Sequence, residues 1–104
     1  MSSNGTDTSR WFFFTNHFHV LLYVARNPDA RLRTVAEEVG ITERAAHRIL
    51  TQLASDGYVS VNKMGRRNHY TVIPGTRLRH PANVDVPIEP LVDVVNRAVR
   101  DGHE

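Results

Sequence analysis

Apolar residues recur at helical spacing on both sides of Gly40, near the middle of the chain. These positions are Val35, Ala36, Val39, Ile41, Ala46, Ile49, Leu50 and Leu53. Because residues three or four apart share one face of a helix, the spacing predicts two short amphipathic helices packed face to face. Gly40 is expected to end the first helix, since glycine adopts a left-handed backbone conformation without steric cost.

Capping residues mark the start of each predicted helix. Thr34 and Glu37 fit a capping box, in which two side chains satisfy backbone amides at a helix start, and they predict a first helix over 35–39. Thr42 is expected to cap the second helix, which runs to about Asp56. The order predicts a helix-turn-helix over 32–53, and a plain helical hairpin with a solvated charged face is the alternative.

A β-hairpin pattern follows the second helix. Residues 58–62 alternate between apolar and polar side chains, and residues 69–72 form a suitable partner strand. The segment 63–68 between them is basic and contains a glycine. It is expected to form a wing beside the second helix, and an exposed hairpin tip kept soluble by its charge is the alternative.

This order of elements resembles the winged helix-turn-helix domain of the MarR and ArsR families of transcription regulators. The resemblance covers roughly residues 14–72 and is carried by the apolar pattern around Gly40 and by the stretch GYVSVNKMGRRNHYTV. It implies an α+β fold, with a three-helix core and a β-hairpin wing in a domain over 11–73, and an extra C-terminal helix. It also implies a sequence-specific regulator that binds double-stranded DNA.

The resemblance implies that the recognition helix, 42–56, enters the major groove, while the wing, 63–68, lies on the backbone or in the minor groove. The residues expected to contact DNA are Thr42, Glu43, Arg44, Ala45, His47, Arg48, Thr51, Lys63, Arg66, Arg67 and Asn68. Arginine suits both surfaces, because a guanidinium group can bind guanine or phosphate through two hydrogen bonds.

Two segments before the motif also carry structural signals. Thr15 or Asn16 is expected to cap a helix that runs to about Arg26 and is apolar on nearly all sides, so it must be covered nearly all round. The aromatic run 10–14 is predicted as a short strand, with the start of this helix as the alternative. A second short strand, Arg31–Arg33, is expected to pair with the wing.

The C-terminal part divides into an extended, proline-rich connector, 74–87, and an amphipathic helix, 88–104. In MarR- and ArsR-like proteins terminal helices form the dimer interface, so the resemblance implies a homodimer. The residues expected at this interface are Phe18, Leu22, Ile88, Leu91, Val92, Val95 and Val99. The alternative is that the helix packs back on its own subunit.

The charge distribution supports a nucleic-acid partner more than the net charge of +2 does. Residues 63–79 include five basic side chains and no acidic one, whereas acidic residues outnumber basic ones from Pro81 onward. Arg77 and Arg79 in this basic stretch either reach phosphate or are simply solvated. A chain of 104 residues is expected to form one domain with a small core.

Composition also narrows the location. The chain has no cysteine, which suits an intracellular protein without disulfides. The polar segment 1–10 is expected to be disordered and lacks the apolar core of a signal peptide, and no apolar run is long enough to cross a bilayer. These features predict a cytoplasmic protein that does not bind membranes.

Histidine and aromatic residues raise the question of a metal, ligand or catalytic site. His17 and His19 would point about 200° apart on a helix, so we expect no metal site and no cofactor. We find no nucleophile elbow, phosphate-binding glycine loop or paired carboxylates, and we predict that the protein is not an enzyme. Residues 11–14 could line a pocket for a small-molecule effector, although packing in a core or interface is favoured.

Two function classes remain after these exclusions. One is a homodimeric, sequence-specific DNA-binding regulator, and the other is a winged-helix module that binds protein. Arg44, His47, Arg48 and the wing favour the first, because a protein-docking surface would more often present apolar anchors.

Overall fold

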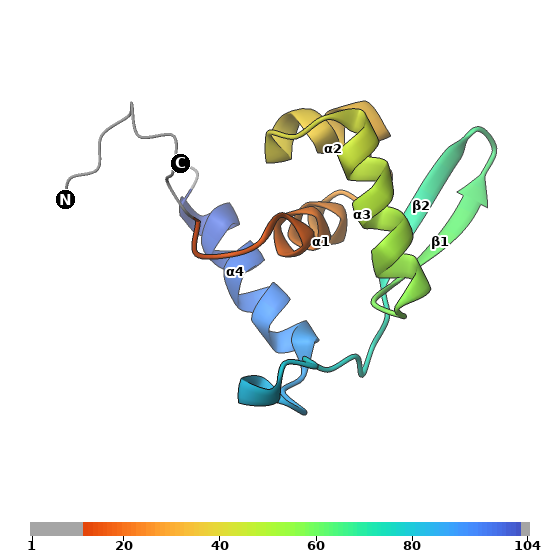
Figure 1. The fold of residues 1–104 in the computed structure, drawn as a ribbon. Helices are drawn as coiled ribbons and strands as arrows, with labels where there is room; N and C mark the ends of the chain where they lie inside the picture. Colours follow the sequence, from red (N-terminus) through yellow and green to blue (C-terminus); the bar gives the residue numbers. More distant parts are fainter. Residues whose placement is uncertain (1–11, 103–104) are drawn as a thin grey trace.

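The computed structural model of the protein describes residues 12–102 and shows a winged helix-turn-helix, which confirms the predicted α+β fold (Figure 1). Its elements are α1 (Asn16–Arg26), α2 (Leu32–Val39), α3 (Glu43–Ser55), β1 (Val59–Met64), β2 (Arg67–Val72), a short 3-10 helix (Pro81–Asn83) and α4 (Ile88–Gly102). In this part of the chain, no helix is long and apolar enough to span a membrane.

Local capping explains where two of the helices begin. The Thr15 hydroxyl accepts a hydrogen bond from the Phe18 amide at 3.3 Å, so Thr15, one of the two expected caps, is the N-cap and α1 starts at Asn16. The Thr42 hydroxyl likewise accepts from the Ala45 amide at 3.0 Å and caps α3. Gly40 lies between α2 and α3 with a φ of 86°, the left-handed conformation expected of a glycine that ends a helix.

The predicted start of α2 is wrong. The helix begins at Leu32 with Arg31 as its N-cap, so Thr34 lies inside the first turn and forms no capping box with Glu37. Leu32 packs against the apolar core, and extending the helix by this turn buries part of its side chain. The strand predicted for Arg31–Arg33 is therefore also wrong.

The wing pairs with the backbone at Pro28, before the segment 31–33 that was predicted to pair with it. The Tyr70 amide of β2 donates to the Pro28 carbonyl at 2.9 Å, in the turn between α1 and α2. The strand predicted for the aromatic run is absent over Phe12–Phe14, the described part of that segment. The Phe14 ring instead packs against α1, where its centroid lies 4.7 Å from the centroid of the Phe18 ring.

The wing is an antiparallel hairpin that is longer than predicted. Lys63 pairs with Asn68 and Met64 with Arg67, so the strands continue to a two-residue loop, Gly65 and Arg66. Gly65 has a φ of 67°, and a glycine with positive φ at the first loop position is typical of tight hairpin turns. Lys63 and Asn68 therefore lie on strands rather than in the tip.

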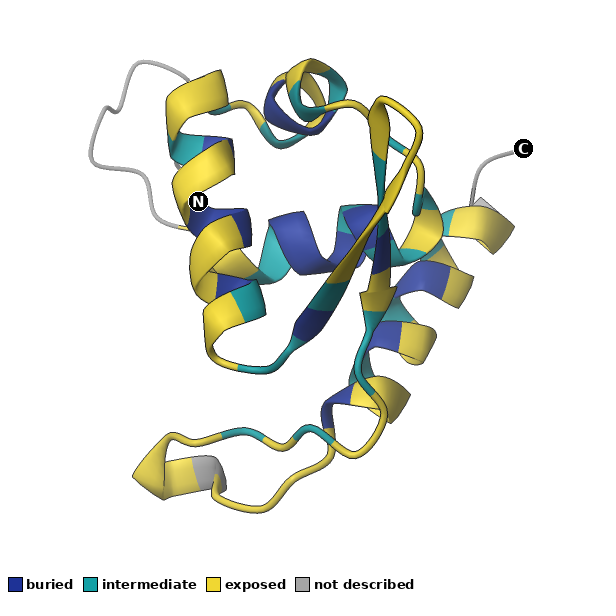
Figure 2. Cartoon of the chain, turned by 90° about the vertical axis from the view of Figure 1, so that its right-hand side faces the viewer, coloured by how far each residue is buried: buried dark blue, intermediate teal, exposed yellow. Residues whose placement is uncertain are grey.

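The core is built around α1, which is covered on several sides as its sequence requires. Val20 and Val24 are fully buried, together with Val35 of α2, Ile49 of α3 and Val59 of β1. Helix α1 contacts α2, α3, β2 and α4. Figure 2 shows the buried residues of these elements turned toward one another in the middle of the molecule.

Helix α4 packs on α1 of its own subunit, which was the alternative to a dimer contact. Ile88 and Val92 are buried there, and so is Leu22 on α1. These three residues were predicted at the dimer interface, but they belong to the core of the single chain because α1 needs cover on this side. Phe18, Leu91, Val95 and Val99 are half-buried, and their place in an interface stays a prediction.

Asn96 is a polar residue buried between α4 and α1. Its Nδ2 donates to the Leu22 carbonyl at 3.2 Å, and its Oδ1 accepts from Nη1 of Arg26 at 2.8 Å. Both contacts cross between the two helices. Asn96 therefore fixes the register of α4 on α1.

The segment 74–87 folds back on itself instead of running on as an extended connector. The Leu78 amide donates to the Val86 carbonyl at 2.8 Å, and Arg77 pairs with Pro87 in an isolated bridge. This loop lies below α1 and α4 in Figure 1. It brings the chain to the start of α4 through a hydrogen bond from the Ile88 amide to the Thr76 carbonyl at 2.9 Å.

Replacing Asn96 with alanine should lower the free energy of unfolding by about 1 to 3 kcal/mol, because two hydrogen bonds between α4 and α1 are lost. Urea denaturation followed by circular dichroism measures this. Arg97→Ala, on the exposed side of the same helix, is the control and should change the free energy by less than about 0.5 kcal/mol. Equal stability of the Asn96 variant and the wild type would contradict the assignment.

Candidate nucleic-acid interface

The outer face of α3 is exposed and carries most of the predicted base-reading residues. Its inner face is buried through Ala46, Ile49, Leu50 and Leu53. The exposed residues of the outer face are Glu43, Arg44, His47, Arg48, Thr51, Gln52 and Ser55. Figure 2 shows the outer side of this helix coloured as exposed. Ala45 is only half-exposed, and the Thr42 hydroxyl is engaged in capping the helix.

The start of α3 lies next to the start of α2. Nε of Arg33 lies 3.5 Å from Oε2 of Glu43, and both side chains are exposed. Glu43 is therefore paired with a cation on the neighbouring helix. Arg31, the N-cap of α2, is a second exposed arginine on this helix end. Sequence reasoning missed Arg31 and Arg33 because it assigned them to a strand, although two arginines one residue apart before the apolar pattern were a visible signal.

The wing residues differ in how free their side chains are. Lys63 and Arg66 are exposed and make no hydrogen bond or ion pair with another residue of the described chain. Arg67 instead donates from Nη1 to the Asp29 carbonyl at 3.3 Å, and Nδ2 of Asn68 donates to the Tyr70 hydroxyl at 3.5 Å. The cations available to an outside partner are thus those at positions 63 and 66.

A hollow of about 310 Å³ separates α3 from the wing. Its lining residues are Leu32, His47, Leu50, Thr51, Ala54, Val61, Asn68 and Tyr70. His47 and Thr51 from α3 thus face the same groove as Asn68 from β2. The structure therefore gathers residues that were predicted separately on the recognition helix and on the wing.

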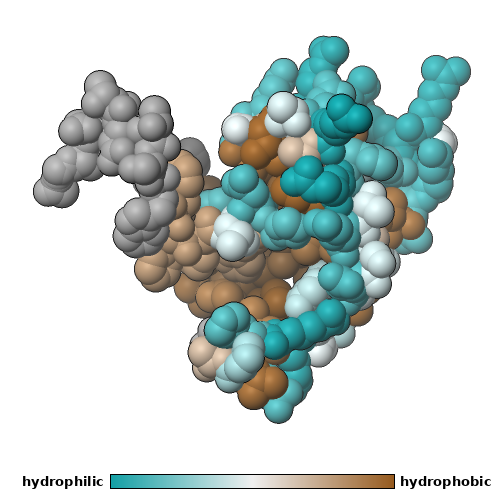
Figure 3. All heavy atoms as spheres, viewed as in Figure 1, coloured by the Kyte–Doolittle hydropathy of each residue, from teal (hydrophilic) through white to brown (hydrophobic). Residues whose placement is uncertain are grey.

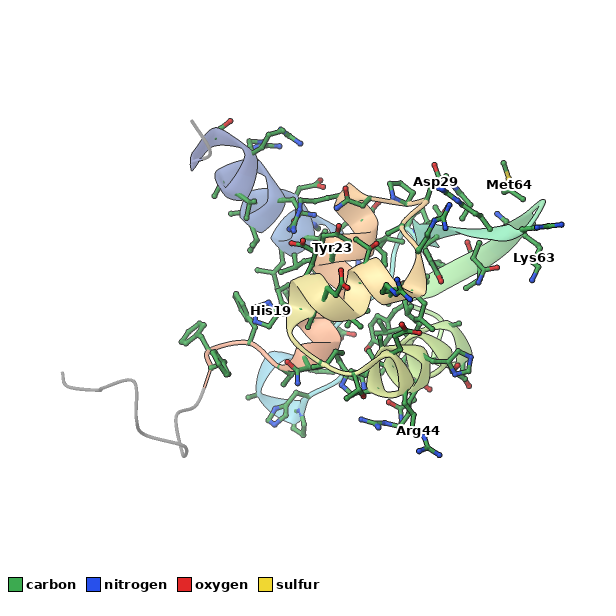
Figure 4. The ribbon with its side chains drawn as sticks, turned by 90° about the horizontal axis from the view of Figure 1, so that it is seen from above. His19, Tyr23, Asp29, Arg44, Lys63 and Met64 are labelled. Carbon is green, nitrogen blue, oxygen red and sulfur yellow. The ribbon has the colours of Figure 1, made fainter. Side chains whose placement is uncertain are left out.

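Arg44 and the wing tip mark two edges of this surface. In Figure 4, Arg44 points away from the body of the protein on one side, while Lys63 and Met64 lie at the outer end of the hairpin. Helix α3 and the hairpin both lie on the opposite side of α1 from α4 (Figure 1). A basic helix and a basic hairpin side by side can hold an extended polyanion between them.

Arg77 and Arg79 do not extend this surface. Arg77 donates to the Asp85 carbonyl, and Arg79 donates to the Asp56 carbonyl at the end of α3 while its guanidinium lies 4.7 Å from the Tyr58 ring. The Arg79 contacts hold the loop against the end of α3, where a cation is also favoured by the negative end of the helix dipole. Within the basic stretch 63–79, Lys63 and Arg66 are thus available to a partner, whereas Arg77 and Arg79 form contacts within the fold.

The histidines of the described part of the chain do not gather at one site. Among residues 12–102, no group of three or more acidic or histidine side chains is placed to hold a metal ion. His17 bonds with Gln52 at 2.6 Å, and His69 bonds with Asp29 at the same distance. These histidines instead connect elements of the fold.

The aromatic run borders a second hollow, of about 460 Å³, between α1, α2 and α4. Phe12 and Phe14 line it with Val95 and Val99 of α4, and Figure 4 shows His19 and Tyr23 on the α1 side. Trp11 lies outside the described residues. A role of this hollow in binding a small-molecule effector stays a prediction.

Comparison with known proteins gives a match for the part of the chain that contains α1, α2 and α3. A search of curated proteins gives no match. One family model matches the part of the chain that runs from α1 through α3 to the start of β1. This match does not test the resemblance to the MarR and ArsR families, which stays a prediction. Residues 14–60 of the chain match the family model for winged helix-turn-helix DNA-binding domains.

Proposed function

We propose that the protein is a sequence-specific, double-stranded DNA-binding transcription regulator that acts in the cytoplasm as a homodimer. It works by binding and not by catalysis. The observation that carries the proposal is the continuous exposed surface formed by α3 and the basic hairpin, with His47, Thr51 and Asn68 around one groove. The family match supports the same use of this fold.

Helix α3 has the dimensions and side chains for reading bases. An α-helix with its side chains is about 10–12 Å wide and fits a major groove of about 12 Å. Arg44 and Arg48 are four residues apart and exposed, so they share one face. Each guanidinium can bind the two acceptor atoms of a guanine, and this gives sequence preference.

Contacts with the phosphate backbone would come from the flanking elements. Arg31 and Arg33 lie at the start of α2, next to the start of α3, and Lys63 and Arg66 project from the hairpin. Such contacts position a protein on DNA without selecting a sequence. We therefore assign base reading to α3 and orientation to the two flanks.

The second candidate function is a protein-binding module. The observation that favours it is apolar surface on the wing, where Val61 is exposed and Met64 has an exposed fraction of 60%. Two apolar side chains among arginine and lysine make a small anchor for a protein partner. Binding that falls steeply with salt would favour DNA over this alternative.

The dimer is inferred from an apolar edge that α4 leaves uncovered. Val94 has an exposed fraction of 61%, and Leu91, Val95 and Val99 are half-buried beside it. Figure 3 shows hydrophobic atoms gathered over α4 and the start of α1. A two-fold dimer through this edge would present two copies of α3 to an inverted-repeat operator. Sequence reasoning missed Val94 because it lies off the buried stripe.

Replacing Arg44 or Arg48 with alanine should weaken binding to the preferred operator by about 1 to 3 kcal/mol and leave binding to random DNA nearly unchanged, because a base contact is lost. Fluorescence anisotropy with an operator selected from genomic fragments measures both affinities. Arg97→Ala on α4 removes the same charge away from α3 and is the control. Equal losses on both DNAs would reassign the two arginines to phosphate.

Replacing both Lys63 and Arg66 with glutamine should weaken binding to all sequences and lower the slope of log affinity against log salt by about two, because two counterions fewer are released. A salt titration of anisotropy from roughly 50 to 200 mM measures the slope. Arg97→Gln together with Arg100→Gln is the matched control on α4. An unchanged slope would remove the wing from the interface.

The full chain should sediment as a dimer at micromolar concentration. Val94→Lys should raise the dimer dissociation constant by roughly a hundredfold or more, because an unpaired charge is costly to bury. Asp93→Lys, exposed on the same helix but off the apolar edge, should leave the dimer intact. Analytical ultracentrifugation measures the constant, and a wild-type monomer or an unaffected Val94 variant would place the interface elsewhere.

A further inference from the structure

Three contacts tie the wing to the turn between α1 and α2. The carboxylate Oδ1 of Asp29 accepts a hydrogen bond from Nδ1 of His69 at 2.6 Å, and the Asp29 carbonyl accepts from Arg67 at 3.3 Å. The neighbouring Pro28 carbonyl accepts from the Tyr70 amide at 2.9 Å. Figure 4 shows Asp29 beside the hairpin, with Lys63 and Met64 farther out.

The outer part of the hairpin has few other attachments. Val59 and Tyr70 are buried and anchor its base in the core. Between residues 60 and 69, every hydrogen bond or ion pair from the hairpin to the described helices and loops ends on Asp29. A two-stranded ribbon is marginally stable by itself, so its outer end takes its direction from these contacts.

The energy of the Asp29 contacts is small. The side chain of Asp29 is 63% exposed and that of His69 is 34% exposed, and exposed pairs of this kind add little to folding stability. A contact with so little effect on stability can still decide where a flexible element points, because the alternative orientations differ by equally small energies.

We propose that Asp29 is a positioning residue for the wing. Through His69 and Arg67 it holds the hairpin so that Lys63 and Arg66 face the same nucleic-acid surface as α3. Arg67 then acts as part of this attachment rather than as a phosphate contact. The proposal rests on the proposed DNA-binding function.

The sign of the charge gives the proposal a direct test. Asp29 is an anion near a surface proposed to bind a polyanion, so its direct effect on DNA is repulsive. Removing the carboxylate should tighten binding if charge alone matters. If Asp29 positions the wing, the same change should weaken binding.

The DNA experiment compares Asp29→Ala with Glu37→Ala, which removes one negative charge from an exposed position on α2. At roughly 0.1 M salt, Asp29→Ala should weaken operator binding about five- to tenfold, the effect of losing one phosphate contact, and Glu37→Ala should not weaken it. His69→Ala should reproduce the loss without adding to it in the double variant, because both act through one contact.

A double-mutant cycle separates positioning from general destabilisation. Arg66→Ala should weaken binding by the wild-type chain about five- to tenfold, but by less than about twofold in the Asp29→Ala background, because a misdirected wing no longer brings Arg66 to DNA. Equal effects of Arg66→Ala in both backgrounds would overturn the proposal. So would binding by Asp29→Ala as tight as that of the wild type.

Amide hydrogen exchange tests the attachment in the free protein, where DNA plays no part. The Tyr70 amide should exchange several-fold faster in Asp29→Ala than in the wild type or Glu37→Ala, while core amides of α3 and the urea midpoint stay the same. Unchanged exchange at Tyr70 would overturn the attachment itself. A wild-type chain that binds no DNA would overturn the proposed function, and the exchange result would still decide whether Asp29 holds the hairpin.

Discussion

The structure depends on the burial of one helix that is apolar on nearly every side. Val20 and Val24 of α1 are fully buried, and Leu21 and Leu22 nearly so. No single neighbour can cover such a helix, so α2, α3, β2 and α4 all pack around it. The positions of α3 and of the hairpin therefore follow from the need to cover α1.

This arrangement separates two kinds of surface. Helix α3 and the hairpin cover α1 on one side and present their cations outward, while α4 covers the other side and leaves an apolar edge that includes Val94 (Figures 1 and 3). From Pro81 onward, five acidic residues outnumber two basic ones, whereas residues 63–79 carry five basic residues and no acidic one. Binding to a polyanion and association with a second copy thus need not compete for the same residues.

Contacts of very different energy have different tasks in this fold. Buried side chains such as Ile49 and Tyr70 supply stability, because each removes apolar surface from water. Asn96 adds a buried polar contact that allows one register of α4 on α1. Exposed pairs such as Asp29 with His69 add little stability, yet they orient an element that has few other attachments.

The sequence by itself determined the features that depend on near neighbours in the chain. Thr15 and Thr42 cap helices within three residues, and Gly40 ends one, so the three-helix and hairpin order was predictable. Tertiary packing decided the rest. Because Leu32 packs against the core, α2 begins about one turn earlier than the predicted capping box indicated. Ile88, Val92 and Asn96 are buried because α4 packs on α1. These outcomes depend on partners up to 74 residues away, which local propensity and periodicity do not register.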